Sequence, residues 1–367
     1  MGANADRAVA PSVHQLVPNL AFGDAISQQA LTLRAVLRSL GCRSEIYSQH
    51  VDVRLRGEAR PFVQLRDAEG DRCHVVFHFS LGSEVTDYYR CLPNPRTIVY
   101  HNITPPEFFR GVNERVASLC ARGREELASL RPTCRLALGA SEFNRQELTA
   151  LGFQTIGTLP YVVDPVRYEQ RPVRRLGHEY GDGWTNLLHV GRLVPNKRLE
   201  DVIKVFWFFR RKINPKSRLI LVGIDTDMEI YSFALQNLVR DLDLQGVVFA
   251  GQATERELAT YYRLAHAYVC MSEHEGFCVP LIEAMHFGVP VIAYAAAAIP
   301  ETVGDAGALV FEKRFPEIAE LVALACEEGN LRRSLVEAGR ERARAFQPDA
   351  IRPRVQRLLE TAWGDGA

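Results

Sequence analysis

The chain has 367 residues, of which 47% are hydrophobic, and its 44 Lys and Arg residues balance 44 Asp and Glu residues. This length predicts about two domains with ordinary buried cores. The zero net charge gives no argument for binding nucleic acid or for strong attraction to a membrane. The eight cysteines are scattered without CxxC spacing, so we expect reduced core residues in a cytoplasmic protein.

The N-terminal segment 1–13, MGANADRAVAPSV, lacks the basic start and apolar block of a signal peptide. Asp6 stands where an N-myristoylation motif has Ser or Thr. No apolar run approaches the roughly 18 residues needed to cross a bilayer. We therefore expect a cytoplasmic protein without an anchor.

In chain order, the first predicted element is a helix over residues 25–40, which ends at Gly41 as a C′ residue. Apolar runs follow at 73–80 (CHVVFHFS), 96–103 (RTIVYHNI) and 134–141 (CRLALGAS). They lack strict alternation, which is typical of parallel strands that are covered on both faces. The first half is therefore predicted to form one parallel sheet with helices on its faces.

Composition changes at residues 164–184, DPVRYEQRPVRRLGHEYGDGW, which are rich in Arg, Pro and Gly and poor in aliphatic residues. Such a stretch is typical of a domain boundary. We place the domains at residues 1–165 and 166–346. The segment 347–367, after Gln347-Pro348, reads as a terminal helix.

The second half again alternates apolar runs with helix patterns. A helix is predicted over 199–213, and Thr254 with Glu257 forms a capping box that opens another. Alternating strands and helices predict α/β units with right-handed crossovers, and thus a Rossmann-like sheet in each half. The predicted strands are 185–193, 217–223, 246–251, 267–273, 289–295 and 307–312.

The stretch 272–294, SEHEGFCVPLIEAMHFGVPVIAY, follows one of these strands. Ligands of open parallel sheets bind outside the carboxyl ends of the strands. Pro280 fits the first position of a helix. The backbone amides from Gly276 to Val279 would then form an anion site at the helix N-terminus, and Gly276 would let the backbone come close.

Two carboxylates flank this predicted anion site. Glu275 lies in the loop and Glu283 about one turn into the helix. A diphosphate with a sugar on one side and a nucleoside on the other fits this spacing, because carboxylates form charge-assisted hydrogen bonds with hydroxyl groups. The required cations are Arg192, directly after a strand, and Lys197 five residues on, both at the same sheet edge.

These stretches together resemble the C-terminal half of retaining glycosyltransferases of family 4 (glycosyltransferase group 1), which have the GT-B fold. The resemblance implies two Rossmann-like domains facing each other across a cleft, an N-terminal acceptor domain and a C-terminal domain for a nucleotide-sugar donor. It also implies that the C-terminal helix returns to the N-terminal domain. The matching stretches are 189–203, 247–269, 272–294 and 299–310.

The resemblance also implies residue roles. Arg192 and Lys197 correspond to the diphosphate clamp, Glu275 to the sugar-hydroxyl contact and Glu283 to the ribose contact. In the N-terminal half, His101 stands at the place of the family's active-site histidine, which contacts the transferred sugar. The residues expected to bind the donor are Gly23, Asp24, Gly191, Gly276, Phe277, Cys278, Val279 and Glu283.

Two departures from the family pattern bear on donor choice. Cys278 stands where the family commonly has Gly or Ser, and AAAAIPE (295–301) stands where a glycine-rich loop is common. Alanine and glycine differ in their φ preferences.

Several residues have structural alternatives. Asp24 fits a plain N-cap, Glu283 fits a helix N-terminus, and Arg192 and Lys197 fit solvated surface charges. His101 and a second strand-end histidine, His78, fit core histidines.

We expect no metal and no cofactor. Asp225-Thr226-Asp227 spells a D-x-D motif but reads better as a turn before a helix. The aromatic run 206–209, followed by basic residues, could give weak contact with the inner face of a membrane, although a packed helix is favoured.

The predicted function is transfer of a hexose from a nucleotide-diphosphate sugar, with retention, to a hydroxyl of a glycan, a glycolipid or a small glycosylated molecule. The alternatives are a nucleotide-sugar epimerase of the same fold and a non-catalytic nucleotide-sugar or glycan-binding module. A dinucleotide-dependent dehydrogenase is disfavoured because no G-x-G-x-x-G follows a strand.

Overall fold

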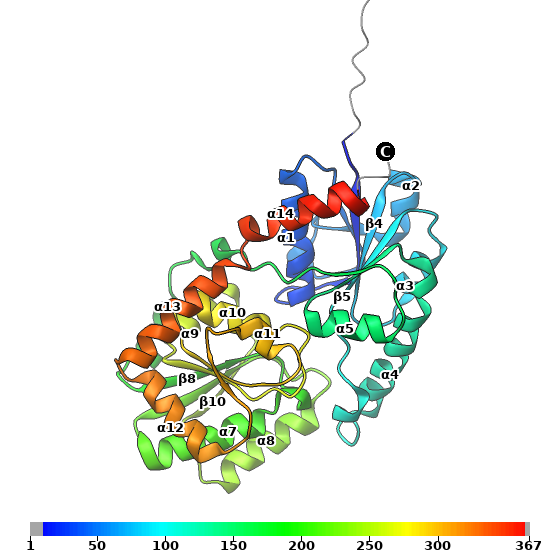
Figure 1. Cartoon of the computed structure of the whole chain (residues 1–367). Coiled ribbons are helices and arrows are strands. Elements are labelled where there is room, and N and C mark those ends of the chain that lie inside the picture. The colour runs from blue at the N-terminus through cyan, green and yellow to red at the C-terminus, as the bar shows by residue number, and fades with distance from the viewer. Residues whose placement is uncertain (1–9, 364–367) are drawn as a thin grey trace, which may run out of the picture.

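The computed structural model describes residues 10–363. The N-terminal expectations that concern residues 1–9, including Asp6, lie outside this part of the chain. Two fully parallel sheets form the centres of two α/β domains, and helices cover both faces of each sheet (Figure 1). The predicted fold class of two Rossmann-like domains is thereby confirmed.

The N-terminal sheet has seven strands in the order β3-β2-β1-β4-β5-β6-β7. Strand β1 pairs in parallel with β2 on one side and with β4 on the other. Successive strands are therefore added toward one edge of the sheet up to β3 and toward the opposite edge from β4 on, and the strand order reverses between β1 and β4. The strands are β1 (Val13–Leu20), β2 (Ile46–Val51), β3 (Arg60–Pro61), β4 (His74–Phe79), β5 (Arg96–Tyr100), β6 (Leu136–Gly139) and β7 (Ile156–Thr158).

Five helices connect these strands. The longest two, α1 and α4, begin at Asp24 and Asn113, whose side chains accept hydrogen bonds from backbone amides in the first helical turn. The helices are α1 (Ala25–Ser39), α2 (Leu65–Glu69), α3 (Glu84–Cys91), α4 (Glu114–Ser129) and α5 (Glu142–Ala150). Short 3₁₀ turns lie at Val53–Leu55, Phe62–Gln64, Pro106–Phe108 and Arg131–Thr133.

The C-terminal sheet repeats this plan with six strands in the order β10-β9-β8-β11-β12-β13. Here the reversal falls between β8 and β11. The strands are β8 (Thr185–Val190), β9 (Ser217–Val222), β10 (Val247–Gly251), β11 (Ala267–Cys270), β12 (Val291–Tyr294) and β13 (Ala308–Val310).

The remaining helices cover this sheet, and the last of them lies near the C-terminus of the chain. The predicted capping box of Thr254 and Glu257 opens α9, with both reciprocal hydrogen bonds formed. The helices are α6 (Arg174–Tyr180), α7 (Leu199–Phe208), α8 (Glu229–Asp241), α9 (Glu255–Leu264), α10 (Val279–His286), α11 (Ile299–Val303), α12 (Phe315–Cys326), α13 (Asn330–Arg344) and α14 (Pro348–Leu358). Short 3₁₀ turns at Pro165–Tyr168 and Pro195–Lys197, and π-helical turns at Phe209–Ile213 and Leu359–Trp363, complete the elements.

The last helix crosses back to the first domain. In Figure 1, α14 lies against α1 of the first domain, away from the sheet of the second domain that precedes it in the chain. Trp363, which is 1% exposed, donates a hydrogen bond from Nε1 to Oγ1 of Thr97 on β5 (3.0 Å). Ile351 and Val355 of α14 share one hydrophobic cluster with strands of the N-terminal sheet. The expected return of the terminal helix is therefore present.

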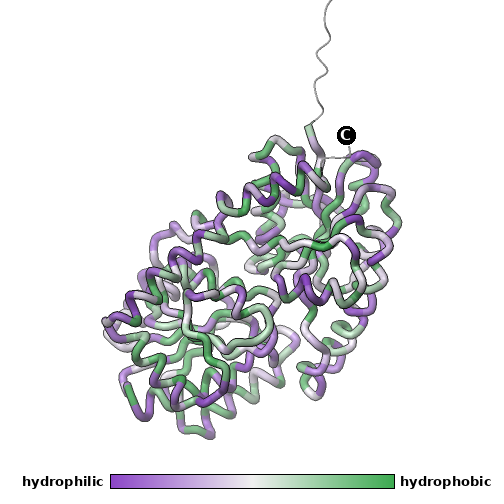
Figure 2. Tube along the Cα trace, in the orientation of Figure 1, coloured by the Kyte–Doolittle hydropathy of each residue, from purple (hydrophilic) through white to green (hydrophobic). Residues whose placement is uncertain are grey.

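Buried apolar strands account for most of the fold. All six residues of β4 are buried, as are all six of β9. Figure 2 shows the complementary pattern in the outer helices, where hydrophilic and hydrophobic residues alternate along the tube. Each of the nine predicted apolar runs contains a strand, but β1, β2, β3 and β7 were not predicted.

Two smaller expectations need correction or refinement. The cysteines are free, but Cys91 is exposed, so the interpretation of all eight as core residues is wrong for this one. Phe206 and Phe209 are buried, and Trp207 and Phe208 pack against the same core, as the packed-helix interpretation requires. Among the described residues, no helix is both long and apolar enough to cross a membrane.

Candidate functional site

The predicted site residues follow strands that lie at, or one strand away from, the two points where the strand order reverses. Gly23 and Asp24 follow β1, and His101 follows β5, in the first domain. Gly191 follows β8, and Glu275 follows β11, in the second. Because the carboxyl ends of the strands beside such a reversal form the usual ligand crevice of open α/β sheets, both domains present a binding edge to their junction.

An ion pair lies at the centre of the C-terminal edge. Nζ of Lys197, in the turn after β8, donates to Oε1 of Glu275 at 2.6 Å, and both side chains are largely buried (14% and 12% exposed). Burial alone would lower the pKa of Lys197, but the Glu275 carboxylate more than offsets this, so the pKa lies above its ordinary value. Lys197 is therefore a permanent cation held against a carboxylate.

Close backbone packing fixes this lysine. Gly191 has φ of +151°, and a Cβ added there would lie 2.9 Å from Cε of Lys197. Arg192, the next residue, is exposed and donates to the backbone oxygen of Thr226 at 3.1 Å. One cation is thus locked by its surroundings, whereas the other has only a single tether on the surface.

The predicted amide edge starts one residue earlier than expected. Helix α10 begins at Val279, so Pro280 occupies its second position rather than its first. Cys278 precedes it with φ of +73°, a left-handed conformation in which the Cβ of a non-glycine residue is strained. Ala297, in the loop where the family commonly has glycine, has φ of +50°. This chain therefore keeps a glycine-like backbone at both departures.

Glu283 lies deeper than the sequence suggested. It is 6% exposed, and its two carboxylate oxygens accept hydrogen bonds from the hydroxyl groups of Tyr168 (2.7 Å) and Tyr262 (2.8 Å). Each carboxylate oxygen can accept a further bond. Its ribose contact stays a prediction, and any ribose would bind a carboxylate already oriented by two tyrosines.

On the N-terminal edge, Asp24 caps α1. Its Oδ2 accepts hydrogen bonds from the backbone amide and the hydroxyl of Ser27, both at 2.8 Å. Burial raises the pKa of Asp24, while the bonds from Ser27 and the positive charge of Arg192 in the other domain act in the opposite direction. Gly23 precedes it with φ of +79°, and a Cβ added there would meet open space. Asp24 thus serves as an N-cap and also faces Arg192 across the junction.

Three neutral side chains, Gln15, His78 and His101, are linked by hydrogen bonds. Nε2 of Gln15 donates to the backbone oxygen of Ala30, so its Oε1 accepts from Nε2 of His78 (2.8 Å). Burial lowers the pKa of His78 to about 3, so its Nδ1 carries no proton and accepts from Nε2 of His101 (2.8 Å). Burial, together with His78, also holds the pKa of His101 well below its ordinary value.

The direction of these bonds determines the free nitrogen of His101. Because its Nε2 carries the proton, its Nδ1 is a bare acceptor, and this buried atom has no hydrogen-bond partner among the described residues. Burying an unsatisfied acceptor is costly. His101 therefore offers one lone pair to a hydroxyl group.

The two domains touch beside this histidine. A Cβ added at Gly276 would lie 2.5 Å from Cβ of Asn102 and 2.7 Å from the backbone oxygen of His101. Asn102 has φ of +83°, and its Oδ1 accepts from Nε2 of His274 in the other domain at 2.7 Å. Only glycine at 276 allows the loops after β5 and β11 to approach this closely.

Comparison with known proteins identifies the second domain. Residues 182–342 match the family model described as glycosyl transferases group 1. This match covers most of the second domain. The chain is 25% identical over 224 residues to O-antigen chain mannosyltransferase B of Escherichia coli, covering 58% of this chain and 57% of that protein. It is 29% identical over 191 residues to N-acetyl-alpha-D-glucosaminyl L-malate synthase of Bacillus anthracis, covering 51% and 48%. It spans about half the length of these curated relatives.

Solved structures show that this chain shares its whole fold with known proteins. Sucrose-phosphate synthase from Thermosynechococcus elongatus superposes with a TM-score of 0.74 at 18% identity, covering 96% of this chain and 99% of that one. Anabaena Alr3699/HepE in complex with UDP-glucose gives 0.73 at 16% identity, covering 95% and 99%. At these identities the likeness concerns the GT-B fold alone.

Sequence reasoning missed several residues of this candidate site. Gln15 and His274 lie far from His101 in sequence, so no local pattern could have joined them. Tyr161, 7% exposed, packs its ring between those of His101 (centroids 5.2 Å apart) and Phe277 (5.4 Å). His78 and His101, in contrast, were noted because each ends an apolar run.

The D-x-D motif forms the turn that we expected. The backbone oxygen of Asp225 accepts from the amide of Met228, and Asp227 has φ of +63°, directly before α8. Among residues 10–363, no three His, Cys, Asp or Glu side chains are grouped so as to hold a metal ion.

Proposed function

We propose that this protein is a retaining glycosyltransferase of group 1 that moves a hexose from a nucleotide-diphosphate sugar to an acceptor hydroxyl. The observation that carries the proposal is the buried Lys197–Glu275 pair, which lies next to Gly276 at the point of contact with His101. A cation, an anion and a neutral acceptor thus meet within one junction. A donor consisting of diphosphate and sugar needs all three.

The diphosphate would bind at the cationic side. Lys197 has two further N–H groups beside the one given to Glu275, and Arg192 can reach from the surface with a bidentate guanidinium. The amides that start α10 add partial positive charge. Together they would stabilise the negative charge that develops on the leaving diphosphate.

The sugar would lie between the two domains. The free oxygen of Glu275 and Nδ1 of His101 are acceptors that suit sugar hydroxyl groups. Glu283, oriented by its two tyrosines, would accept from the ribose. These assignments place the cations at the diphosphate and the hydrogen-bond acceptors at the hydroxyl groups of the sugar and the ribose.

The proposed reaction breaks the bond from the anomeric carbon to the diphosphate oxygen, and the electron pair stays on the diphosphate. The acceptor oxygen forms the new bond on the same face, and its proton passes to the departing phosphate oxygen. Glu275 is occupied by Lys197 and is assigned to hydroxyls, so it is not assigned as a nucleophile. The scheme uses no metal ion and no cofactor.

Names of similar proteins support the substrate class. One relative is called a mannosyltransferase and another a synthase of a glucosaminyl malate, and one structural neighbour contains UDP-glucose. A hexose donor and a hydroxyl acceptor on a glycan, a glycolipid or a small molecule fit these names. Buried packing of the aromatic run leaves only its basic end, such as exposed Arg211 and Lys212, for weak contact with the inner face of a membrane in the cytoplasm.

The proposal is tested by thermal unfolding with UDP, GDP, ADP and TDP, followed by transfer assays with the matching sugar nucleotides. A ligand that binds the folded state raises the apparent melting temperature. Arg192→Ala and Glu275→Gln should each reduce transfer, whereas Lys212→Ala, on the outer surface, should not. Full transfer activity in Glu275→Gln would refute the assignment.

The same assay separates the alternatives. An epimerase would change the donor without an acceptor, and a binding module would release no nucleoside diphosphate when donor and acceptor are both present. The anomeric configuration of the product, read by NMR coupling constants, decides between retention and inversion.

A further inference from the structure

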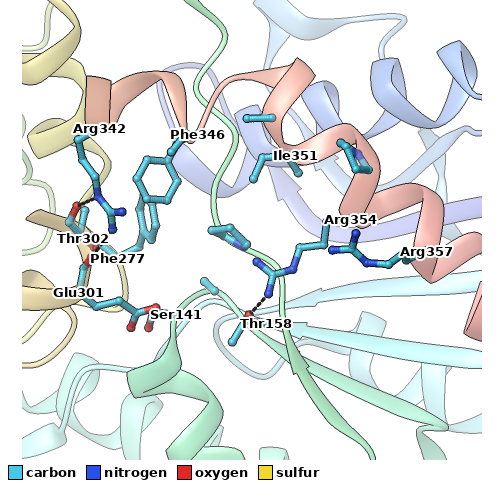
Figure 3. Close-up of a pocket in the computed structure, with 15 residues that line it drawn as sticks. Ser141, Thr158, Phe277, Glu301, Thr302, Arg342, Phe346, Ile351, Arg354 and Arg357 are labelled. Carbon is cyan, nitrogen blue, oxygen red and sulfur yellow. Dashed lines mark hydrogen bonds between the residues drawn. The ribbon is translucent and has the colours of Figure 1, made fainter. Parts of the chain in front are cut away.

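A pocket lies at the domain junction beneath the returning helix, with a volume of about 480 Å³. Its walls come from three places: the ends of β6 and β7, the segment from Phe277 to Thr302, and the end of α13 with the following helix α14 (Figure 3). This size is typical of sites for small molecules. It shares Phe277 with the predicted donor site, but Lys197, Glu275 and His101 do not line it, so it adjoins that site without containing its charged pair or its histidine.

Three arginines line this pocket, and none of them forms an ion pair with a carboxylate of residues 10–363. Arg342 donates to the backbone oxygens of Glu301 and Thr302, and Arg354 donates to Oγ1 of Thr158 at 2.6 Å. The guanidinium of Arg357 makes no hydrogen bond or ion pair with another described residue. Figure 3 shows Arg354 and Arg357 on one wall and Arg342 on the opposite one.

The single acidic side chain in the wall does not neutralise them. The Glu301 carboxylate accepts from the backbone amides of Glu142 (2.8 and 2.7 Å) and Phe143 (3.4 Å), at the start of α5 in the other domain. With three guanidinium groups and one carboxylate, the lining carries a net charge of +2.

A comparison within the molecule shows how unusual this is. Another pocket, of about 440 Å³ beside β2, also contains arginines. There Arg43 pairs with Glu69, and Arg38 pairs with Glu45 at 2.8 Å. Two of the three arginines in that pocket are thus paired with carboxylates, whereas none of the three in the junction pocket is paired with a carboxylate of a described residue.

We propose that the junction pocket binds a phosphorylated small molecule, with the phosphate held by Arg354 and Arg357 and the organic part lying on Phe346 and Ile351. Guanidinium groups bind phosphate bidentately and are preferred for this purpose. The apolar side chains in the wall would cover a ring or a short carbon chain. Because the walls belong to both domains, the occupant bridges them.

The electrostatics of the pocket are consistent with such a ligand. Burial lowers the pKa of Arg354 and the neighbouring Arg357 lowers it further, whereas the Glu301 carboxylate acts in the opposite direction without offsetting them. Burial also lowers the pKa of Arg342, and Glu301 and Asp305 offset this only in part. A phosphate dianion would reverse these effects by supplying the missing opposite charge.

The test is calorimetric titration of the full chain with inorganic phosphate at constant ionic strength. Arg357→Ala should weaken binding about tenfold or more, since it removes a charge-assisted contact, and it should unfold normally because its guanidinium has no partner to lose. The matched control is Arg352→Ala on the same helix, which removes the same charge but lies outside the pocket. It should bind phosphate as the parent does.

A second control separates this pocket from the donor site. Arg192→Ala should keep phosphate binding if the ion occupies the junction pocket. Three results would overturn the proposal. The first is loss of phosphate binding in Arg192→Ala while Arg357→Ala still binds, and the second is equal weakening of binding by Arg352→Ala and Arg357→Ala. The third is that the parent protein binds neither inorganic phosphate nor the phosphorylated ligands described next.

The second arm identifies the source of the phosphate. Glycerol phosphate in solution and phosphatidylcholine vesicles with phosphatidic acid present the same group on a small molecule and on a lipid. Binding of the former that depends on Arg357 indicates a soluble metabolite. Vesicle binding alone that depends on Arg357 indicates a lipid headgroup.

Discussion

The two domains repeat one sheet plan but bring different chemistry to their junction. The C-terminal edge uses paired charges: Lys197 with Glu275, and Glu273 with Arg198 and Lys313. The N-terminal edge uses a neutral chain from Gln15 to His101. The same topology can therefore hold an ionic ligand at one face and a neutral one at the other, because the strand ends supply position and the side chains supply polarity.

The substitution with the largest expected effect is Lys197→Ala, which tests the role of the charged C-terminal edge. It removes the buried cation and leaves the Glu275 carboxylate unpaired beside the diphosphate, so transfer should fall by about 10²–10³ in kcat/KM. Nucleotide affinity, measured by calorimetry, should fall as well. Lys212→Ala is the control for loss of one positive charge. An unchanged nucleotide affinity would mean that the C-terminal edge does not bind the phosphates.

Gly276→Ala tests whether the two edges must touch. The added methyl group would collide with Asn102 and the backbone of His101, so the junction must open. We expect transfer to fall by about 10²-fold, since small misplacements of reacting groups cost this much. Nucleotide binding should change far less. Gly329→Ala, which meets open space, is the control, and small-angle scattering would report the opening. An unchanged scattering profile with full activity would contradict the contact.

Gln15→Leu addresses the neutral edge. Without the Gln15 oxygen, His78 can carry its proton on Nδ1 and donate it to Nε2 of His101. His101 then carries its own proton on Nδ1, so its free nitrogen becomes a donor. We expect kcat to fall about tenfold, and ¹⁵N shifts of the imidazoles should show the changed tautomer. Gln15→Glu should restore the acceptor and part of the rate, and Gln28→Leu on α1 is the control. A rate loss without a tautomer change would indicate a packing defect instead.

The pH dependence of stability affects both domains and tests their shared burial of neutral histidines rather than one edge. Burial lowers the pKa of His78 to about 3 and that of His189 to about 4. Their neutral forms stabilise the fold fully above the unfolded pKa of about 6.5, and this contribution is lost as pH falls from there toward the folded values. Each histidine should contribute about 1.4 kcal/mol per pH unit within that window. Urea unfolding at pH 7 and pH 5 measures the slope, and equal stability at both would contradict it.

The sequence predicts those elements whose burial is visible in composition. The nine apolar runs stood out because parallel strands covered on both faces need such residues. Strand β1 did not, although it lies in the middle of its sheet, because it carries His14, Gln15 and Pro18. Gln15 and its neighbour His78 on β4 are polar for the sake of the site, and this weakens the local pattern.

The site shows the same division. Lys197 and Glu275 could be placed together because both follow adjacent strands of one predicted sheet. The bonds of His101 to His78, and of Asn102 to His274, depend on strand pairing and domain docking over long sequence separations. The tyrosines that hold Glu283 likewise come from α9 and from the turn at Pro165–Tyr168.

The returning helix has a consequence for the order of folding. Trp363 and Val355 complete the hydrophobic core of the first domain, yet the ribosome makes them after the entire second domain. During synthesis, the second domain can finish before the first has all of its core. The domain that is begun first is thus the one completed last, and until then its exposed apolar surface is a target for chaperones.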